Sequence, residues 1–285
     1  MLNSLPCFVL AFLLFLSSSH WAKINPFTAD RDFLFANGSM SNPAGLSLLS
    51  QNQLEVNYSQ PFFGYQQLSL ESAFLLTKWS FALGYHTFGT SDIPRVAAVT
   101  GSSRPTATDY FVHDFQRYVA ALSFEVEKGV NFGATATLLK QQLDSDYAES
   151  LVADFGFEWQ TSDFFWLGLY SQNFFQTPYQ WQKSGLIELL SRKFIIQTGL
   201  RWDDHKLVAS SDFDFYRLAG EARLSPAFSL IADSVWQKNF EMRRLSYGAI
   251  LELDSWALRY AHVQFSAKDL QADQDQLGLL FRFGR

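Results

Sequence analysis

The sequence predicts an all-β fold in which about fourteen antiparallel strands close into a transmembrane β-barrel, preceded by an N-terminal plug segment. Three observations predict this fold. Apolar and polar residues alternate with a period of two along most of the chain, aromatic residues are abundant, and short polar turns alternate with longer connections. In a soluble sandwich the apolar face of each strand packs a core, whereas in a membrane barrel it faces lipid and the polar face lines the lumen. Composition and connection lengths favour the barrel.

The composition is unusual for a soluble domain. Of the 285 residues, 48% are hydrophobic and 17% are aromatic, including 29 Phe and 8 Trp. Charged residues make up 18%, which is too many for a helical membrane protein, and no apolar run after the N-terminus reaches the length of a membrane-spanning helix. The formal net charge of -6 gives no indication of a basic face for nucleic acid, so no nucleic-acid partner is expected.

The first 19 residues are typical of a secretory signal peptide. The apolar run 8–16 has the length of a signal core, and Ser17, Ser18 and Ser19 supply small residues for cleavage, although no Lys or Arg precedes the run. An N-terminal membrane anchor is the alternative. Cys7 is the single cysteine and would leave with the signal, so the mature chain is expected to lack disulfides, thiolate metal sites and cysteine nucleophiles.

Residues 20–53 show no regular alternation and form the predicted plug segment. Phe33, Leu34 and Phe35 are too apolar for a solvated tail, and the stretch 42–45 provides a tight turn with little bulk. We expect this segment to fold into or against the periplasmic mouth of the barrel, with a plain loop before the first strand as the alternative. The candidate plug or gate residues are Asp30, Arg31, Asp32, Asn42, Pro43 and Gly45.

The barrel is predicted over residues 54–285. Its strands are expected at 54–58, 68–76, 79–88, 115–126, 130–140, 151–159, 164–173, 194–202, 206–215, 217–224, 228–236, 245–253, 256–260 and 277–283. Most of these segments have about nine to eleven residues, the length of a tilted bilayer crossing, and Trp and Tyr gather near their ends as in an aromatic girdle.

Connection lengths set the predicted strand number and topology. Residues 89–114, 141–148 and 174–193 are expected to be loops at the extracellular end, whereas turns such as 254–255 lie in the periplasm. A fifteenth strand at 185–190 would break the alternation of short and long connections, so we assign this segment to an outer loop. Both termini of the mature chain are then periplasmic.

Short motifs add a resemblance to a known group. The stretch Ser-Asn-Pro-Ala-Gly-Leu at 41–46 is similar to the Asn-Pro-Ala-Gly-Leu signature near the mature N-terminus of FadL-like outer-membrane barrels, in the branch that contains the PorV and PorQ components of type IX secretion. Gly168-Leu169-Tyr170 leading to Asn173, and Gly220-Glu221, resemble two further motifs of that group. The resemblance implies a plugged barrel that either transports small molecules or serves a secretion complex.

The sequence departs from that group in three places. The glycine-rich run that usually precedes the signature is absent, Ala222 stands where an aromatic residue is expected, and the chain ends in Phe-Gly-Arg instead of an aromatic residue. These departures leave the choice between a transport and a secretion role open.

Charged residues on the polar faces are expected to point into the lumen. A charge on the lipid face would cost about 2–4 kcal/mol at the bilayer midplane, so the alternation fixes their side. They either pair with one another and hold the barrel closed, or line a substrate path. The candidate lumen-lining residues are Arg201, Asp212, Glu221, Arg223, Asp233, Glu252, Arg259 and Arg282.

Enzymatic motifs are missing from the sequence. The His residues are far apart with no metal-ligand spacing, and neither a Gly-x-Ser-x-Gly elbow nor a phosphate-binding glycine loop occurs. We therefore expect no catalytic residues, no metal and no cofactor. The expected function is passage of hydrophobic small molecules across the outer membrane of a Gram-negative-type bacterium, with outer-membrane lipid and that small molecule as partners. The alternative is a non-enzymatic scaffold that binds proteins of a type IX-like secretion or envelope complex.

Overall fold

The computed structural model describes residues 42–49, 51–60, 65–97, 106–202, 205–267 and 270–284. The predicted signal peptide and the plug candidates Asp30, Arg31 and Asp32 lie outside these described residues. No helix in the described part of the chain is long and apolar enough to cross a membrane.

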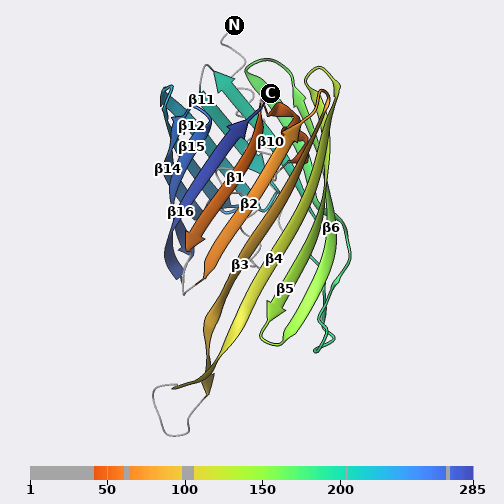
Figure 1. Cartoon of the computed structure of the whole chain (residues 1–285), viewed down its shortest axis with the longest axis vertical. Helices are drawn as coiled ribbons and strands as arrows, with labels where there is room; N and C mark the ends of the chain where they lie inside the picture. Colours follow the sequence, from red (N-terminus) through yellow and green to blue (C-terminus); the bar gives the residue numbers. More distant parts are fainter. Residues whose placement is uncertain are drawn as a thin grey trace.

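Fourteen antiparallel strands form one closed barrel (Figure 1). In chain order they are β1 (Asn52–Gln60), β2 (Gln66–Leu75), β3 (Trp79–Ala97), β4 (Thr106–Glu127), β5 (Val130–Leu143), β6 (Asp146–Gln160), β7 (Phe165–Gln176), β10 (Lys193–Trp202), β11 (His205–Ser211), β12 (Phe215–Ser225), β13 (Phe228–Gln237), β14 (Met242–Leu253), β15 (Trp256–Ala267) and β16 (Leu270–Phe283). The barrel closes where β1 pairs with β16, from Asn52 opposite Phe283 to Gln60 opposite Asp275. The predicted fold class and strand number are confirmed.

Side-chain burial follows the alternation that the sequence predicts. On β1, Glu55 and Asn57 are buried, whereas Leu54, Val56 and Tyr58 are exposed. Large apolar side chains are exposed in the same alternating way along the other strands, and the buried partners on the opposite face are largely polar. A barrel immersed in lipid has this pattern because its outer surface must be apolar and its lumen can hold polar groups.

The short turns and the C-terminal Gly284 lie at one end of the barrel, called here the short-turn end (Figure 1). Several turns there have only two residues, and both Gly129 and Asp254 adopt a positive φ, of 78° and 48°. Tight hairpin turns need this conformation, which costs little for glycine and is tolerated by aspartate. The other end, called the outer end, carries the remaining connections. The predicted N-terminus of the mature chain is outside the described residues.

Several strands are longer than predicted at the outer end. Within the predicted loop 89–114, residues 89–97 and 106–114 are strand, because β3 continues to Ala97 and β4 begins at Thr106, and the two strands pair beyond the barrel (Figure 1). The pairing of β2 with β3 ends at Gly89, and outside the barrel wall β3 and β4 pair with each other. Pro94 is compatible with such a ribbon, because a proline is tolerated on an edge strand.

The same error affects two other predicted connections. Residues 141–148 are mostly strand, with a turn only at 144–145, and β15 and β16 extend to Ala267 and from Leu270. Conversely, the predicted strand 206–215 ends early, at Ser211, and the turn 212–214 precedes β12. Outside the bilayer no lipid requires one face to be apolar, so pairing continues there without the alternating pattern.

The segment 185–190 is outside the barrel, as predicted. It contains β9 (Ile187–Glu188), which pairs with β8 (Tyr179–Gln180) in a separate two-stranded sheet. This small sheet belongs to the long connection between β7 and β10 at the outer end. The assignment of 185–190 to an outer loop is therefore confirmed.

Candidate lumenal site

A short 3₁₀ helix, η2 (Pro43–Leu48), lies against the inner wall near the short-turn end. Asn42 caps it: its side-chain oxygen accepts a hydrogen bond from the Ala44 N–H at 3.1 Å. The Asn42 amide also donates to the backbone carbonyl of Phe157 on β6, at 3.3 Å. Asn42 therefore both starts the helix and fastens it to the barrel, which explains why Asn and Pro stand together here.

Three glycines on the inner face make room for this segment. A Cβ atom on Gly156 would overlap the Asn42 side-chain oxygen and lie 2.9 Å from Pro43 Cδ. A Cβ on Gly133 would overlap the backbone of Pro43, and one on Gly168 would lie 3.0 Å from the Asn42 amide nitrogen. These glycines, on β5, β6 and β7, form a seat into which the turn fits because no side chain stands in the way.

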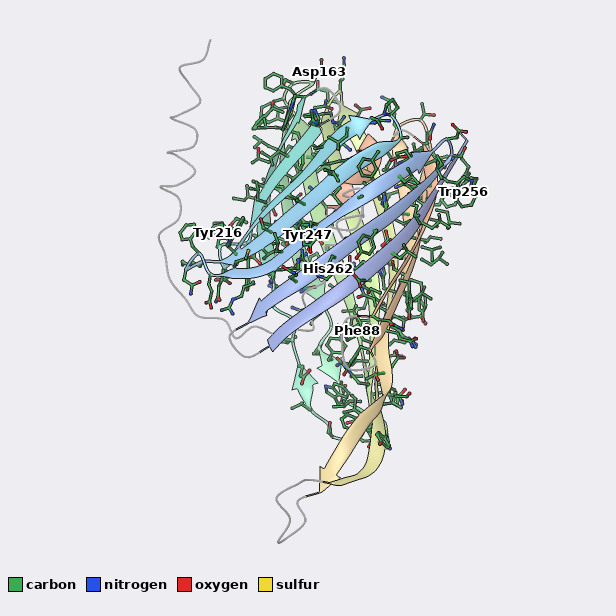
Figure 2. All side chains as sticks on the ribbon, turned by 90° about the vertical axis from the view of Figure 1, so that its left-hand side faces the viewer. Phe88, Asp163, Tyr216, Tyr247, Trp256 and His262 are labelled. Atoms are coloured by element: carbon green, nitrogen blue, oxygen red, sulfur yellow. The ribbon has the colours of Figure 1, made fainter. Side chains whose placement is uncertain are left out.

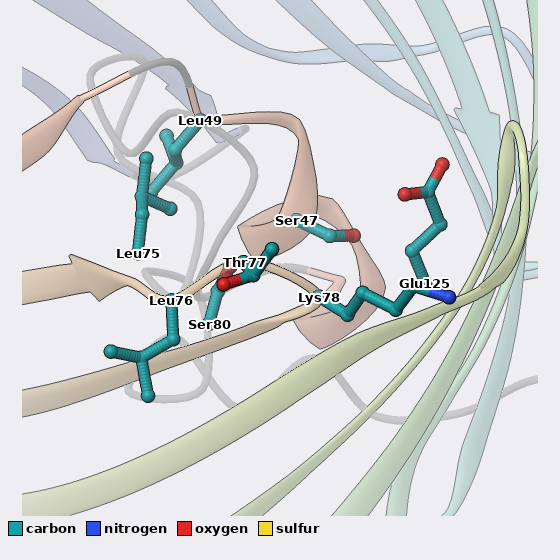
Figure 3. A pocket seen from close by; sticks show the side chains of 8 residues that line it. All are labelled: Ser47, Leu49, Leu75, Leu76, Thr77, Lys78, Ser80 and Glu125. Carbon is teal, nitrogen blue, oxygen red and sulfur yellow. The ribbon is translucent and has the colours of Figure 1, made fainter. Parts of the chain in front are cut away.

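Polar and apolar contacts hold the rest of η2. The Ser123 hydroxyl lies 3.1 Å from the Ala44 carbonyl oxygen and 3.1 Å from the Ser47 hydroxyl. Leu46 is fully buried in a cluster with Ala73, Ala82 and Ala121. Beside η2 the barrel wall encloses a small hollow (Figure 3). Its lining consists of Ser47, Leu49, Leu75, Leu76, Thr77, Lys78, Ser80 and Glu125.

The plug candidates Asn42, Pro43 and Gly45 are thus in contact with the lumen wall, and all three are buried. The sequence indicated this turn and, separately, Gly168, but it did not indicate that they touch. Gly133 and Gly156 were missed. The signal available for them was glycine at inward positions of strands that otherwise alternate regularly.

Filling the glycine seat should release η2. Gly156→Ala is expected to displace Asn42 and Pro43 and to cost about 1–3 kcal/mol of unfolding free energy, because the added methyl has no space. The local change is measured with Ser47→Cys in a chain whose Cys7 is replaced by serine, as the rate of labelling by a water-soluble maleimide. We expect Gly156→Ala to accelerate labelling about tenfold.

Gly220→Ala is the matched control for a strand glycine. Its Cβ would have its nearest neighbours at 3.6 and 3.7 Å, which is ordinary contact. If the thiol introduced by Ser47→Cys is labelled at the same rate in Gly156→Ala and Gly220→Ala, η2 does not depend on the seat.

The strongest charge cluster in the lumen wall surrounds Asp233 on β13. Its side chain is fully buried; one oxygen lies 2.6 Å from Arg217 Nε and the other 2.8 Å from an Arg244 amino nitrogen. Arg217 is on β12 and Arg244 on β14, so one carboxylate joins three neighbouring strands. The sequence indicated Asp233 but neither arginine as its partner.

A second set of ion pairs lies nearer the short-turn end. Glu55 bonds to Arg259 at 2.9 Å, and both side chains are almost fully buried. Arg282 donates hydrogen bonds to the Glu252 carboxylate, and Lys206 Nζ lies 3.3 Å from a Glu221 carboxylate oxygen. Glu55 and Arg259 reach each other across β16, and Glu252 and Arg282 across β15, whereas Lys206 and Glu221 lie on the neighbouring strands β11 and β12.

The remaining lumen candidates are placed differently. Arg223 donates to the backbone carbonyls of Ser225 and Pro226 at the short-turn end. Arg201 is opposite Lys206 and its side chain is exposed. Asp212 is not on a strand, because it lies in the turn between β11 and β12 and pairs with Lys193 at 3.0 Å.

A bulge interrupts the pairing of β6 with β7. The register shifts between Ala153 and Phe155, and Asn173 adopts a φ of 54°. The buried Asp154 carboxylate accepts a 2.6 Å bond from the Asn173 N–H and a 3.1 Å bond from the Thr135 hydroxyl. Asp154 thus stabilises the bulge.

An apolar cluster lies at the outer end of the β4–β6 wall. Leu139, Ala148 and Val152 are buried beneath Tyr179 and Trp181, which come from the connection between β7 and β10. The Trp181 indole nitrogen is buried and has no hydrogen-bond partner among the described residues. This combination of apolar walls and one donor was not indicated by the sequence.

Asp146 fastens the same connection to the tip of the β5–β6 hairpin, beyond the apolar outer band. Its carboxylate accepts bonds from the backbone N–H groups of Lys183 at 2.8 Å, Ser184 at 3.0 Å and Tyr147 at 3.0 Å. The bond from Lys183, followed by those from Ser184 and Tyr147, holds the pKa of Asp146 below its usual value.

A second aromatic group, formed by Tyr65, Phe88 and His113, lies beside the apolar cluster around Trp181. Tyr65 stacks on Phe88 with ring centroids 4.7 Å apart, and its hydroxyl is 3.0 Å from His113 Nδ1. Gln141 Nε2 lies 3.2 Å from the other ring nitrogen of His113. Within the described ranges no three His, Cys, Asp or Glu side chains lie together as metal ligands.

Comparison with known proteins identifies the fold. No protein-family model matches the chain, and no curated protein matches it. The Pseudomonas putida toluene transporter TodX is 11% identical, with a TM-score of 0.60 over 86% of this chain and 92% of that chain. The Ralstonia pickettii toluene transporter TbuX is 11% identical, with a TM-score of 0.62 over 87% and 93%. A Pseudomonas aeruginosa FadL homologue is 12% identical, with a TM-score of 0.56 over 87% and 95%. This chain has a FadL-type barrel fold.

The predicted resemblance to FadL-like barrels is therefore confirmed at the level of the fold. The FadL-type barrel of this chain has its Asn-Pro-Ala-Gly-Leu turn seated on the inner wall. None of the three structures is a PorV or PorQ component, so the resemblance to that branch has no support beyond the motifs.

Proposed function

We propose that the FadL-type barrel lies in the outer membrane of a Gram-negative-type bacterium and lets small hydrophobic molecules pass across it. Two solved structures with this fold are named as toluene transporters, which supports the proposal. The observation that carries it is the apolar cluster around Trp181 at the outer end of the lumen.

This cluster has the properties of a receiving surface for an apolar molecule. Leu139 and Val152 are 3% and 1% exposed under Tyr179 and Trp181, so the inner wall is apolar and dry at this point. An apolar molecule that takes the place of part of these contacts is transferred out of water, and no charged group of the wall is exposed in exchange. The buried indole N–H of Trp181 can donate a hydrogen bond to an acceptor atom that the molecule carries. Forming this bond removes the free-energy cost of a buried donor without a partner.

The wall beyond the cluster is different. It carries the Asp233 group and the Glu55–Arg259 pair, and η2 covers one side of the lumen near the short-turn end. Paired charges give water and ions few free partners, and a seated turn narrows the lumen. The predicted gate role of Asn42, Pro43 and Gly45 is part of this proposal; the other gate candidates lie outside the described residues.

The test is uptake of radiolabelled toluene by cells that carry the full-length chain in their outer membrane. We expect uptake above that of cells without the chain, and Trp181→Ala should raise the half-saturating toluene concentration about tenfold, because a large apolar contact is lost. Tyr147→Ala is the control, since Tyr147 is an aromatic residue at the tip of the β5–β6 hairpin, beside the connection that carries Trp181, and is 51% exposed.

Lactose uptake, measured in parallel, reports on leakage of polar molecules and should not change. Equal toluene uptake in the presence and absence of the chain would contradict the proposed function. The secretion scaffold is the less favoured alternative, because the solved structures that share the fold are named as transporters or as a FadL homologue. The absence of enzymatic activity stays a prediction from the sequence.

A further inference from the structure

The outward face of β14, β15 and β16 carries a polar cluster on a surface that is otherwise apolar. The Asp275 carboxylate oxygen Oδ1 lies 2.7 Å from the Tyr260 hydroxyl and 3.0 Å from His262 Nδ1. The Tyr247 ring packs against His262 with centroids 5.4 Å apart. Tyr247, Tyr260 and Asp275 are well exposed, and Figure 2 shows Tyr247 and His262 on the face of the strands turned to the viewer.

The cluster marks the end of the apolar surface on this side of the barrel. Toward the short-turn end the same faces carry Trp256, Leu258, Leu277 and Leu279, all exposed (Figure 2 labels Trp256). A carboxylate inside the hydrocarbon would be destabilising, so the lipid headgroups must reach the level of Asp275. The cluster therefore faces headgroups.

Its hydrogen-bonding groups are acceptors. The Asp275 carboxylate accepts the bond from His262 Nδ1, so Nδ1 carries a proton, and in the neutral form of the imidazole Nε2 is then an acceptor. The Tyr260 hydroxyl already donates to Asp275, whose side chain is 69% exposed and whose second oxygen can accept further bonds. Arg243, near the outer end of β14, is bonded to Gln237 and Glu241 and does not neutralise Asp275.

We propose that this cluster binds the ammonium group of a phospholipid headgroup. The ammonium supplies a positive charge and further hydrogen-bond donors to the exposed Asp275 carboxylate, and the rings of Tyr247 and Tyr260 attract a cation through their faces. At the edge of the hydrocarbon these attractions are stronger than in bulk water. The inference requires that the barrel spans a membrane, but not that it carries toluene or any other molecule.

The test is native mass spectrometry of the full-length chain in micelles that contain equal amounts of phosphatidylethanolamine and phosphatidylglycerol. These lipids share acyl chains and phosphate, and differ in having an ammonium or a glycerol group. We expect the chain to retain about fivefold more phosphatidylethanolamine than phosphatidylglycerol. One cation–π contact and one exposed ion pair together account for a preference of this size. Asp275→Asn should abolish this preference.

Asp114→Asn is the matched control. Asp114 is in the middle part of β4, opposite Gly89, and its two oxygens lie 3.3 Å from the Thr87 hydroxyl and 2.7 Å from the Gln116 amide. The preference should survive this substitution, and melting temperatures should show that both variants are folded. Equal retention of the two lipids, or a preference that Asp275→Asn leaves intact, would overturn the proposal. Stronger retention of a glucosyl diglyceride than of phosphatidylethanolamine would also overturn it, because the cluster would then bind a sugar headgroup. So would the loss of a dimer in Asp275→Asn, because the cluster would then be a contact between two copies of the chain.

Discussion

Asp233→Asn is expected to lower the unfolding free energy of the barrel by about 3–5 kcal/mol. The substitution keeps the shape of the side chain and removes its charge. Arg217 and Arg244, bonded at 2.6 and 2.8 Å, would then lose the carboxylate that lies between their two positive charges. Because Arg217 is 18% exposed, water screens part of its charge and the loss should fall toward the lower end of this range.

Unfolding by guanidinium chloride in detergent micelles, followed by tryptophan fluorescence, measures this change. Asp212→Asn is the matched control, because Asp212 pairs with Lys193, whose side chain is 34% exposed, and the expected loss is below about 1 kcal/mol. Adding Arg244→Met to Asp233→Asn should recover part of the stability, since one of the two positive charges that Asp233 compensated is removed. Equal losses in Asp233→Asn and Asp212→Asn would show that the Asp233 cluster adds no stability through charge.

The second large effect is expected at Glu55, and it should differ from that at its neighbour Glu71. The two residues are directly opposite each other on β1 and β2, and both are buried. Glu55 bonds to Arg259, whose side chain is 3% exposed. Glu55→Gln therefore leaves a buried guanidinium without its anion, and the expected loss is about 3 kcal/mol or more.

Glu71→Gln should cost less than about 1 kcal/mol in the same measurement. Its carboxylate lies 3.4 Å from His86 Nε2, and removing the charge also removes the repulsion between two carboxylates on adjacent strands. The two variants delete the same chemical group from neighbouring positions, so each serves as the control for the other. A greater loss in Glu71→Gln than in Glu55→Gln would contradict the assignment of Arg259 to Glu55.

The alternation of residues, together with the lengths of the connections, was sufficient to predict the barrel and its fourteen strands. On β1 the sequence alone places Glu55 and Asn57 on one face and Val56 and Tyr58 on the other, because lipid and lumen make opposite demands on neighbouring positions. That demand ends with the bilayer. The outer parts of β3 and β4 therefore looked like a loop in the sequence, although their backbones pair.

The partners of the lumen residues were decided only by the tertiary structure. The sequence indicates that Arg259 faces inward, but its partner Glu55 is 204 residues away and becomes adjacent when β1 closes against β16. Likewise, Gly133 and Gly156 are ordinary positions within their own strands and become a seat only when Pro43 lies over them. A period of two determines the face of a residue, whereas its neighbours across the sheet depend on strand register and closure, which no local pattern encodes.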